Sequence, residues 1–442
     1  MKRLSVTITV ALAGAAALAV PSFVSAQDFA ITNATVATGD GSAPIEGGTV
    51  VVRGGKVVAA GAGVAVPAGV EVIDGSGKWV TPGIFANYTD LGLFDVQEVS
   101  ESDDRGSDGS PFNAALDVAP AINPANEHIA ISREGGVTRA SVTPFNGNSI
   151  FAGQGALIDL GADPDAVTKA RAFQVVALGE GGAKLAGGSR VAAYVALRNA
   201  LREAKDVAAM TPGADRKSDA MLTRADAAAL APVIAGTQPL YVEVERAADI
   251  RSVLSLKRDF PKLDLVLVGA SEGWLVAGEI ATAGVPVIAM ALNDLPAQFD
   301  RIAATQSNVG RMKRAGVKVA IGMLANDNQP RYAPQEAGNL VALNRIPGAA
   351  GLSWGEALAA ITSVPAEISG MDGRNGHMRA GVLAPGAVGD VVVWDGDPLE
   401  LSSAPLQVWI DGVKQPLDNH QSRLKERYKD LDRTYLPKAY DW

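Results

Sequence analysis

The chain has 442 residues, of which 48 are glycine and 20% are charged, and its formal net charge is −9. The complete lack of cysteine excludes disulfides, thiolate nucleophiles and cysteine-bound metals, and the three histidines exclude any site that needs four. The acidic balance argues against a nucleic-acid partner.

The first 26 residues have the order of a secretory signal peptide. Lys2 and Arg3 precede an apolar run from residue 4 to 20, and a small-residue cleavage motif ends at Ala26. A membrane helix is the alternative, but the run is alanine-rich and is followed by Pro21. We expect an exported protein, periplasmic or extracellular. The mature chain has no other apolar stretch of about 20 residues, so no membrane span is expected there.

Strand patterns come first in the mature chain. Between residues 29 and 80, short apolar runs alternate with turns, and the runs at 49–52 and 56–59 flank a turn at Arg53, which predicts a hairpin. From about residue 84 to 370, strand and helix patterns alternate, which predicts a parallel sheet. Five or six such units favour a (β/α)8 TIM-type barrel over a doubly wound sheet.

Strand patterns return after Gly381, near 390–394 and 407–411. The sequence therefore predicts an α/β protein with a barrel at residues 84–380. This barrel is inserted into a small discontinuous β-sandwich domain made of residues 27–83 and 381–418. Residues 419–442 form a helical C-terminal tail in this prediction.

Four motifs are spread along the mature chain, at residues 79–85 (WVTPGIF), 133–138 (REGGVT), 356–362 (EALAAIT) and 389–394 (GDVVVW). In order, they resemble the entry into the first barrel strand, a later strand, the last barrel helix and the return to the β domain in the amidohydrolase superfamily. The likeness is to its exported, imidazolonepropionase-like group. This resemblance implies a hydrolase of C–N bonds in non-peptide or cyclic amides. It also implies one or two divalent metals that activate water, and homodimers as in relatives.

The metal ligands that the resemblance implies are largely replaced. Tyr88 and Asp90 stand where the first strand should carry His-x-His, and Glu243 lies near an expected histidine of the fifth strand. Leu324 stands where the eighth strand should carry an aspartate, and Asp327 follows three residues later. None of the three histidines falls at an expected ligand position.

Two interpretations stay open at this stage. In the first, the protein is a hydrolase in which Asp90 and Asp327 are catalytic and Tyr88 and Glu243 bind substrate. An oxygen-only set of Asp90, Glu243 and Asp327 would suit Mg²⁺ or Ca²⁺ better than Zn²⁺. In the second, which we favour, it is a catalytically inactive barrel without a metal cofactor. Such a pseudoenzyme would bind a small molecule or a partner protein.

The orientation of these side chains can also be predicted. Because residues two apart in a strand share a face, Ala86, Tyr88 and Asp90 should all point toward the barrel mouth. A buried aspartate without a metal is costly, so we expect Asp90 to pair with an arginine or lysine, to accept several hydrogen bonds, or to face water.

A second motif is the G-x-S-x-G sequence around Ser271, between a predicted strand and a predicted helix, as a nucleophile elbow requires. A serine hydrolase would also need a downstream histidine, and only His377 and His420 follow. A plain turn between strand and helix is the simpler interpretation.

Overall fold

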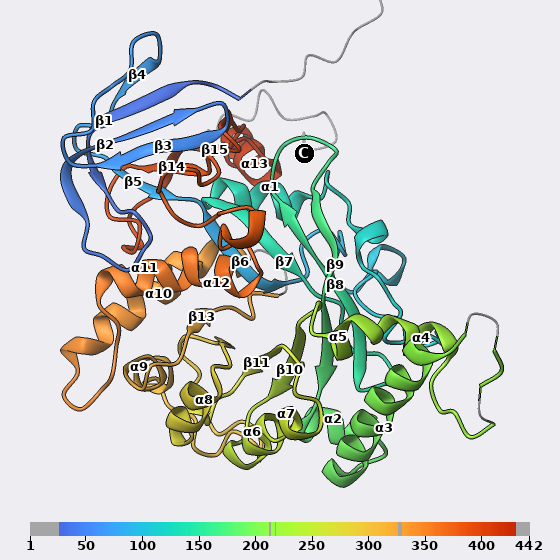
Figure 1. The fold of residues 1–442 in the computed structure, drawn as a ribbon. Helices are drawn as coiled ribbons and strands as arrows, with labels where there is room; N and C mark the ends of the chain where they lie inside the picture. The colour runs from blue at the N-terminus through green and yellow to red at the C-terminus, as the bar shows by residue number, and fades with distance from the viewer. Residues whose placement is uncertain (1–25, 212–213, 217, 326–328, 430–442) are drawn as a thin grey trace, which may run out of the picture.

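The computed structural model describes residues 26–211, 214–216, 218–325 and 329–429 (Figure 1). The predicted signal peptide, except for Ala26, lies outside the described residues, as does the end of the predicted tail. Within the described ranges, no helix is long and apolar enough to cross a membrane.

Strands from both ends of the chain form one sheet. Its order is β16-β15-β14-β5-β1-β2-β3, and β4 pairs with β1. Strand β14 pairs antiparallel with β5, with Val393 opposite Val80, so the expectation that the two segments share a sheet is confirmed. The domain boundaries stay predictions. The strands are β1 (Phe29–Val36), β2 (Ile45–Arg53), β3 (Lys56–Gly61), β4 (Glu71–Asp74), β5 (Trp79–Pro82), β14 (Val391–Trp394), β15 (Pro405–Ile410) and β16 (Val413–Lys414).

A second sheet of eight strands closes into the predicted barrel. The strands follow one another in chain order, and a bridge between Asn87 and Gly322 joins the last strand to the first. They are β6 (Ile84–Thr89), β7 (Val137–Val142), β8 (Phe151–Asp159), β9 (Val167–Ala177), β10 (Leu240–Val244), β11 (Leu265–Gly269), β12 (Val287–Ala289) and β13 (Val319–Ile321).

One barrel strand differs from the simple βα repeat. Strand β8 runs antiparallel to both β7 and β9. The connections at 143–150 and 160–166 are too short for the crossover that a parallel neighbour needs, which takes about a dozen residues or more.

Helices cover the outside of the barrel (Figure 1). Helix α3 begins at the predicted cap, where the Ser189 side chain accepts a hydrogen bond from the Val191 amide. The helices are α1 (Glu127–Glu134), α2 (Gly179–Leu185), α3 (Arg190–Ala209), α4 (Arg224–Ala229), α5 (Ala231–Ala235), α6 (Ala247–Leu254), α7 (Leu256–Asp259), α8 (Ala277–Ala283), α9 (Asn308–Arg314), α10 (Ala333–Ala342), α11 (Trp354–Ile361), α12 (Ser363–Ile368) and α13 (His420–Tyr428).

The barrel strands separate two apolar clusters. On β10, Leu240 and Val242 pack outward against the helices, whereas Tyr241 packs in the lumen, where its ring stacks on Phe173 at 4.2 Å. This alternation directs Glu243 into the lumen, because it is two residues after Tyr241.

A buried arginine joins the barrel to the mixed sheet. Arg139 lies near the amino-terminal end of β7, and its Nε donates to Oδ2 of Asp390 at 2.7 Å. Its Nη2 donates to Oδ1 of Asp411 at 2.7 Å. Both carboxylates flank strands of the sheet, so the barrel and the sheet share one polar core at this end.

Candidate functional site

The carboxyl ends of the parallel barrel strands form one mouth, which is where sites of this fold lie. The first strand bends before it reaches the mouth. Tyr88 has a φ of +63°, and the pairing of β6 with β7 shifts between Ala86 and Thr89. Ser141 supports the bend, since its Oγ accepts from the Tyr88 amide at 2.8 Å and donates to Asn87 Oδ1 at 2.7 Å.

This bend overturns one prediction. Tyr88 packs in the lumen together with Phe85, but Ala86 packs outside, in the cluster between strands and helices. The expectation that Ala86 and Tyr88 share a direction is wrong, because a left-handed residue interrupts the simple alternation of a strand.

Tyr88 and Glu243 meet across the lumen. The Tyr88 hydroxyl donates to Oε1 of Glu243 at 2.5 Å. Burial and the neighbouring Glu243 carboxylate raise the pKa of Tyr88 well above its ordinary value. Burial also raises the pKa of Glu243, while the bond from Tyr88 opposes that rise. The two residues predicted to bind substrate therefore already bind each other.

Asp90 has a cationic partner, which is one of the three environments expected for it. It is 1% exposed, and its Oδ2 lies 3.3 Å from Nη1 of Arg105. The same guanidinium bonds to Asp103 at 2.7 Å and lies 4.2 Å from the ring centre of Phe94. These contacts hold a permanent positive charge beside the carboxylate that stands in the His-x-His position.

A third polar cluster lies at the ends of β10 and β11. Glu245 accepts from the Ser271 hydroxyl at 2.6 Å and from the Ser271 amide at 2.9 Å. Its other oxygen lies 2.8 Å from Nη2 of Arg301, and Asn293 Nδ2 donates to Ser271 Oγ at 2.8 Å. Burial raises the pKa of Glu245, and the charge of Arg301 opposes the rise.

Among the residues that the structure describes, no set of side chains fits the divalent metal that the resemblance implies. Leu324 is buried at the expected aspartate position, and Asp327 lies outside the described residues. The part of the chain that the structure describes holds no group of three or more His, Cys, Asp or Glu that could bind a metal. Each described mouth carboxylate bonds to protein donors, and two of them face arginines, which repel a divalent cation.

The histidines lie elsewhere. His128 stacks on Phe94 with ring centres 4.8 Å apart. His377 has its Nδ1 3.9 Å from Asp372, and His420 begins helix α13, where its amide donates to Glu127. The Ser-His arrangement considered from the sequence is therefore not formed.

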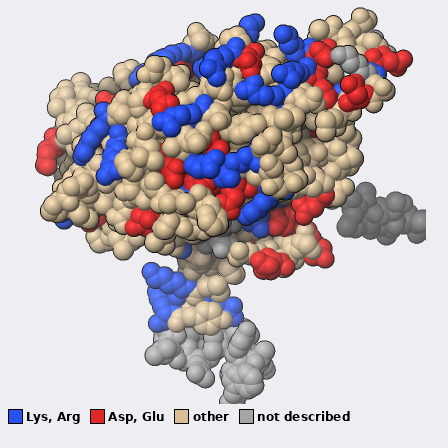
Figure 2. Space-filling model, turned by 90° about the horizontal axis from the view of Figure 1, so that it is seen from below, with Lys and Arg blue, Asp and Glu red and all other residues tan. Residues whose placement is uncertain are grey.

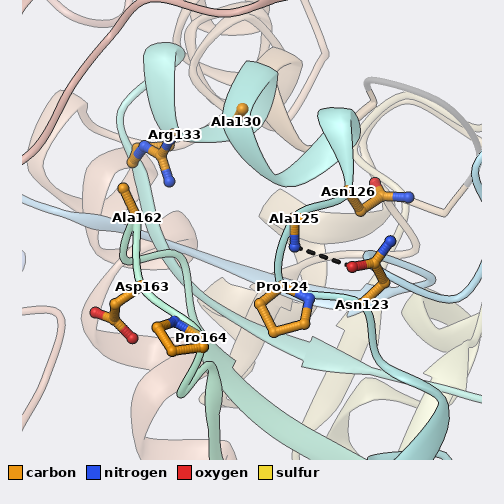
Figure 3. Close-up of a pocket in the computed structure, with 9 residues that line it drawn as sticks. All are labelled: Asn123, Pro124, Ala125, Asn126, Ala130, Arg133, Ala162, Asp163 and Pro164. Atoms are coloured by element: carbon orange, nitrogen blue, oxygen red, sulfur yellow. Dashed lines mark hydrogen bonds between the residues drawn. The ribbon is translucent and has the colours of Figure 1, made fainter. Parts of the chain in front are cut away.

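A separate groove of about 500 Å³ lies between the start of α1 and the loop at 162–164 (Figure 3). Arg133 borders it, and its guanidinium donates to the carbonyl oxygens of Leu160 and Pro416. Because Leu160 follows the end of β8 remote from the mouth, this groove is distinct from the candidate site. Figure 2 shows another face, on which acidic and basic side chains are intermixed.

Comparisons with known proteins agree with this fold. A family model described as Amidohydrolase family matches residues 269–414. The crystal structure of an amidohydrolase from Thermotoga maritima has a TM-score of 0.75 at 23% identity, covering 87% of this chain and 99% of that one. The family likeness thus covers the chain from the end of β11 to β16, and the structural likeness shows the fold.

Two further matches are more limited. A 65-residue segment is 49% identical to "Amidohydrolase tasK" of Hapsidospora irregularis; it is 15% of this chain and only 6% of the length of that relative. The structure of molinate hydrolase has a TM-score of 0.52 at 16% identity, covering 89% of this chain and 96% of that one. The chain thus shares its fold with both proteins of known structure, the Thermotoga maritima amidohydrolase and molinate hydrolase.

Sequence reasoning missed Arg105, Glu245, Asn293 and Arg301. Glu245 could have been found, because it directly follows β10, two residues after Glu243, where the strand alternation would still give it the same face. The other three lie in irregular segments between barrel strands, where no periodicity predicts which side chain reaches the mouth.

Proposed function

We propose that this amidohydrolase relative is an exported protein that works without a bound metal. In this proposal it binds a small polar molecule at the barrel mouth, in contact with Tyr88 and Glu243. The signal-like leader supports export, and the barrel mouth is the ordinary ligand position of this fold.

The ion pair between Asp90 and Arg105 carries the proposal. In the metal-dependent arrangement, a divalent cation would balance the carboxylates and lone pairs of the first strand. Here a guanidinium supplies that positive charge from within the chain, 3.3 Å from the Asp90 carboxylate. A metal beside it would meet repulsion and would compete for the same oxygen.

Two further features support a polar ligand. Tyr88 and Glu243 place a hydroxyl and a carboxylate in the lumen, on opposite strands of the barrel. Close to them, Asn87 is fully buried, and its Nδ2 has no hydrogen-bond partner among the described residues. A buried unpaired donor is costly and is satisfied by a ligand oxygen or an ordered water.

Hydrolysis of a C–N bond is the second candidate function, and the match of residues 269–414 to the amidohydrolase family model supports it. Asp90 and Asp327 would then be the catalytic groups. Asp90 could act on substrate only after Arg105 moved away from it, which makes this candidate the weaker of the two.

Metal analysis of the mature protein, purified without chelators, tests the proposal. We expect far less than one equivalent of zinc, manganese or iron per chain, in the wild type and in Asp90→Asn alike. The substitution Arg105→Ala should increase the affinity for Zn²⁺ or Mn²⁺, because it removes the competing charge. About one tightly bound metal per wild-type chain, lost in Asp90→Asn, would refute the proposal.

A further inference from the structure

The cluster at the ends of β10 and β11 has an arrangement that ligand binding does not need. We propose that Ser271 is a nucleophile for acyl transfer from esters or amides that carry an apolar acyl group, and that Glu245 is its general base. This inference goes beyond the proposed binding function, because it concerns residues other than Tyr88 and Glu243.

The backbone that presents Ser271 is conformationally unusual. Gly269 has a φ of +91° and Ala270 has a φ of +47°. An alanine in the left-handed region is sterically unfavourable, and such residues concentrate at functional sites. A Cβ on residue 269 would lie only 2.5 Å from Glu245 Oε1, so the turn needs glycine to admit the carboxylate. The G-x-S-x-G motif thus serves to bring Ser271 and Glu245 together.

Glu245 is oriented to take the hydroxyl proton. Glu245 Oε2 accepts a hydrogen bond from the Ser271 hydroxyl at 2.6 Å, and Nη2 of Arg301 lies 2.8 Å from Glu245 Oε1. The Glu245 carboxylate therefore takes the role of general base, for which the sequence offered only His377 and His420. A base within hydrogen-bond reach of the nucleophile, oriented by a third group, is the general requirement for an activated serine.

Asn293 completes the cluster. Its Nδ2 donates one hydrogen to Ser271 Oγ at 2.8 Å, and the amide carries a second hydrogen. During attack, this donor would stabilise the negative charge that develops on the substrate oxygen beside Ser271, as side-chain amides do in oxyanion holes.

The reaction balances without a cofactor. Ser271 Oγ forms a bond to the substrate carbonyl carbon, and its proton passes to Glu245 Oε2. The bond from carbon to the leaving group breaks, and the leaving alcohol or amine takes that proton. Water then attacks the acyl-serine, gives a proton to Glu245, and releases the acid, after which the proton returns to Ser271.

The choice of acyl group follows from the segment that carries Asn293 and Arg301. Four large apolar side chains on this segment are strongly exposed, with exposed fractions between 41% and 82%: Met290, Leu295, Phe299 and Ile302. They lie in the same connection between β12 and α9, and Leu295 and Ile302 are within two residues of Asn293 and Arg301, so this segment offers an apolar surface close to the cluster along the chain. An acyl chain of several carbons fits this surface better than a charged one.

Labelling with a fluorophosphonate, followed by peptide mass spectrometry, tests the proposal on the mature protein in EDTA. We expect a covalent adduct on Ser271 and none in Ser271→Ala. Glu245→Gln should slow labelling about a hundredfold, and Asn293→Ala about tenfold. The matched control is Glu272→Gln, because Glu272 is also buried but, among the described residues, accepts from the backbone amides of Ala247 and Ala303 rather than from Ser271. It should label at the wild-type rate.

Hydrolysis of p-nitrophenyl butyrate provides the second measurement, and its rate should follow the labelling rate across the variants. If wild-type Ser271 gains no adduct, or if Glu245→Gln labels as fast as wild type while retaining its melting temperature, the proposal is wrong. Should Glu245→Gln fail to fold, the wild-type adduct and Asn293→Ala still decide. A stoichiometric metal would refute the metal-free binding function and leave this labelling result unaffected.

Discussion

The Tyr88 hydroxyl oxygen lies 2.5 Å from Glu243 Oε1, and this bond links β6 to β10, four strands away in a barrel of eight. These strands are therefore opposite each other, and the tyrosine side chain crosses the lumen. A histidine at position 88 would be shorter and would leave the carboxylate of Glu243 unpaired. The tyrosine at position 88 thus fills the lumen and donates to the buried carboxylate at once.

Removal of this hydroxyl should destabilise the protein. In Tyr88→Phe, Glu243 stays buried but loses its donor, and we expect a loss of about 1–3 kcal/mol in the free energy of unfolding at pH 7.5. Urea denaturation measures it. The pKa of Glu243 is already raised by burial, and loss of the bond raises it further. The loss should therefore be largest at high pH and shrink as Glu243 takes up a proton.

The matched control is Tyr241→Phe, in the same lumen. Tyr241 is also buried, and it stacks on Phe173, but among the described residues its hydroxyl makes no hydrogen bond to a carboxylate. This variant should lose less stability, with no pH dependence between pH 5 and pH 8. Equal losses in the two variants, both independent of pH, would show that the bond to Glu243 has no special role.

The sequence predicted the architecture because the barrel and the discontinuous sheet both leave local patterns of apolar residues along the chain. Alternating strand and helix patterns predicted the barrel, and returning strand patterns after Gly381 predicted the pairing of β14 with β5. The predicted parallel sheet did not include β8, whose antiparallel direction the sequence pattern does not reveal, because a strand buried on both faces has the same apolar composition in either direction. Only the short connections before and after β8, at residues 143–150 and 160–166, indicate its antiparallel direction.

The candidate site was predicted in part. The cost of a buried carboxylate left three environments open for Asp90, and the structure has the first of them, a cationic partner in Arg105. The face of Ala86 was mispredicted, because a positive φ at a non-glycine residue such as Tyr88 has no signature in the sequence. The motif around Ser271 was interpreted chiefly as a plain turn, because its neighbour Glu245 follows a different strand and only the fold brings the two together.

The contact between barrel and sheet should depend on Asp390. This residue is 2% exposed and bonds to Arg139, which is 1% exposed. In Asp390→Asn, the buried Arg139 guanidinium loses its buried carboxylate partner, so we expect a loss of about 3–5 kcal/mol in the free energy of unfolding. The control is Glu367→Gln, which breaks an exposed pair with Lys318 and should cost less than about 1 kcal/mol. Similar small losses in both variants would contradict a structural role for the buried pair.

Closure of the barrel should depend on a glycine. Gly322 bridges to Asn87 between the last and first strands, and a Cβ there would lie 2.3 Å from Ile288 Cγ2 and 2.9 Å from the Asn87 carbonyl oxygen. Gly322→Ala should therefore cost about 1–3 kcal/mol through overpacking.

The control for this change is Gly278→Ala in helix α8. A Cβ on residue 278 would have no atom within 4 Å, so the variant should be more stable by about 0.5–1 kcal/mol. Thermal unfolding of both variants distinguishes the two effects. If Gly322→Ala is as stable as Gly278→Ala, the strands at the closure are free to separate, and tight closure is refuted.

The stability of the protein should depend on pH through Asp159, at the end of β8. Burial raises its pKa to about 6, and the carboxylates of Asp411 and Asp390 contribute in the same direction, against the Gly161 amide and Arg139. In the unfolded chain, an aspartate has a pKa of about 3.9. The native state therefore holds this proton more tightly, so the contribution of Asp159 to stability increases as pH falls from 7 toward 4.

Asp159→Asn removes the charge and keeps an oxygen to accept from the Gly161 amide. We expect the variant to exceed wild type by roughly 2–3 kcal/mol in unfolding free energy at pH 8, and to match it near pH 4. Urea denaturation at a series of pH values measures the difference, with Asp165→Asn as the control, because Asp165 is exposed and carries no burial cost. A difference between Asp159→Asn and wild type that stays constant from pH 4 to pH 8 would mean that Asp159 does not titrate in this range.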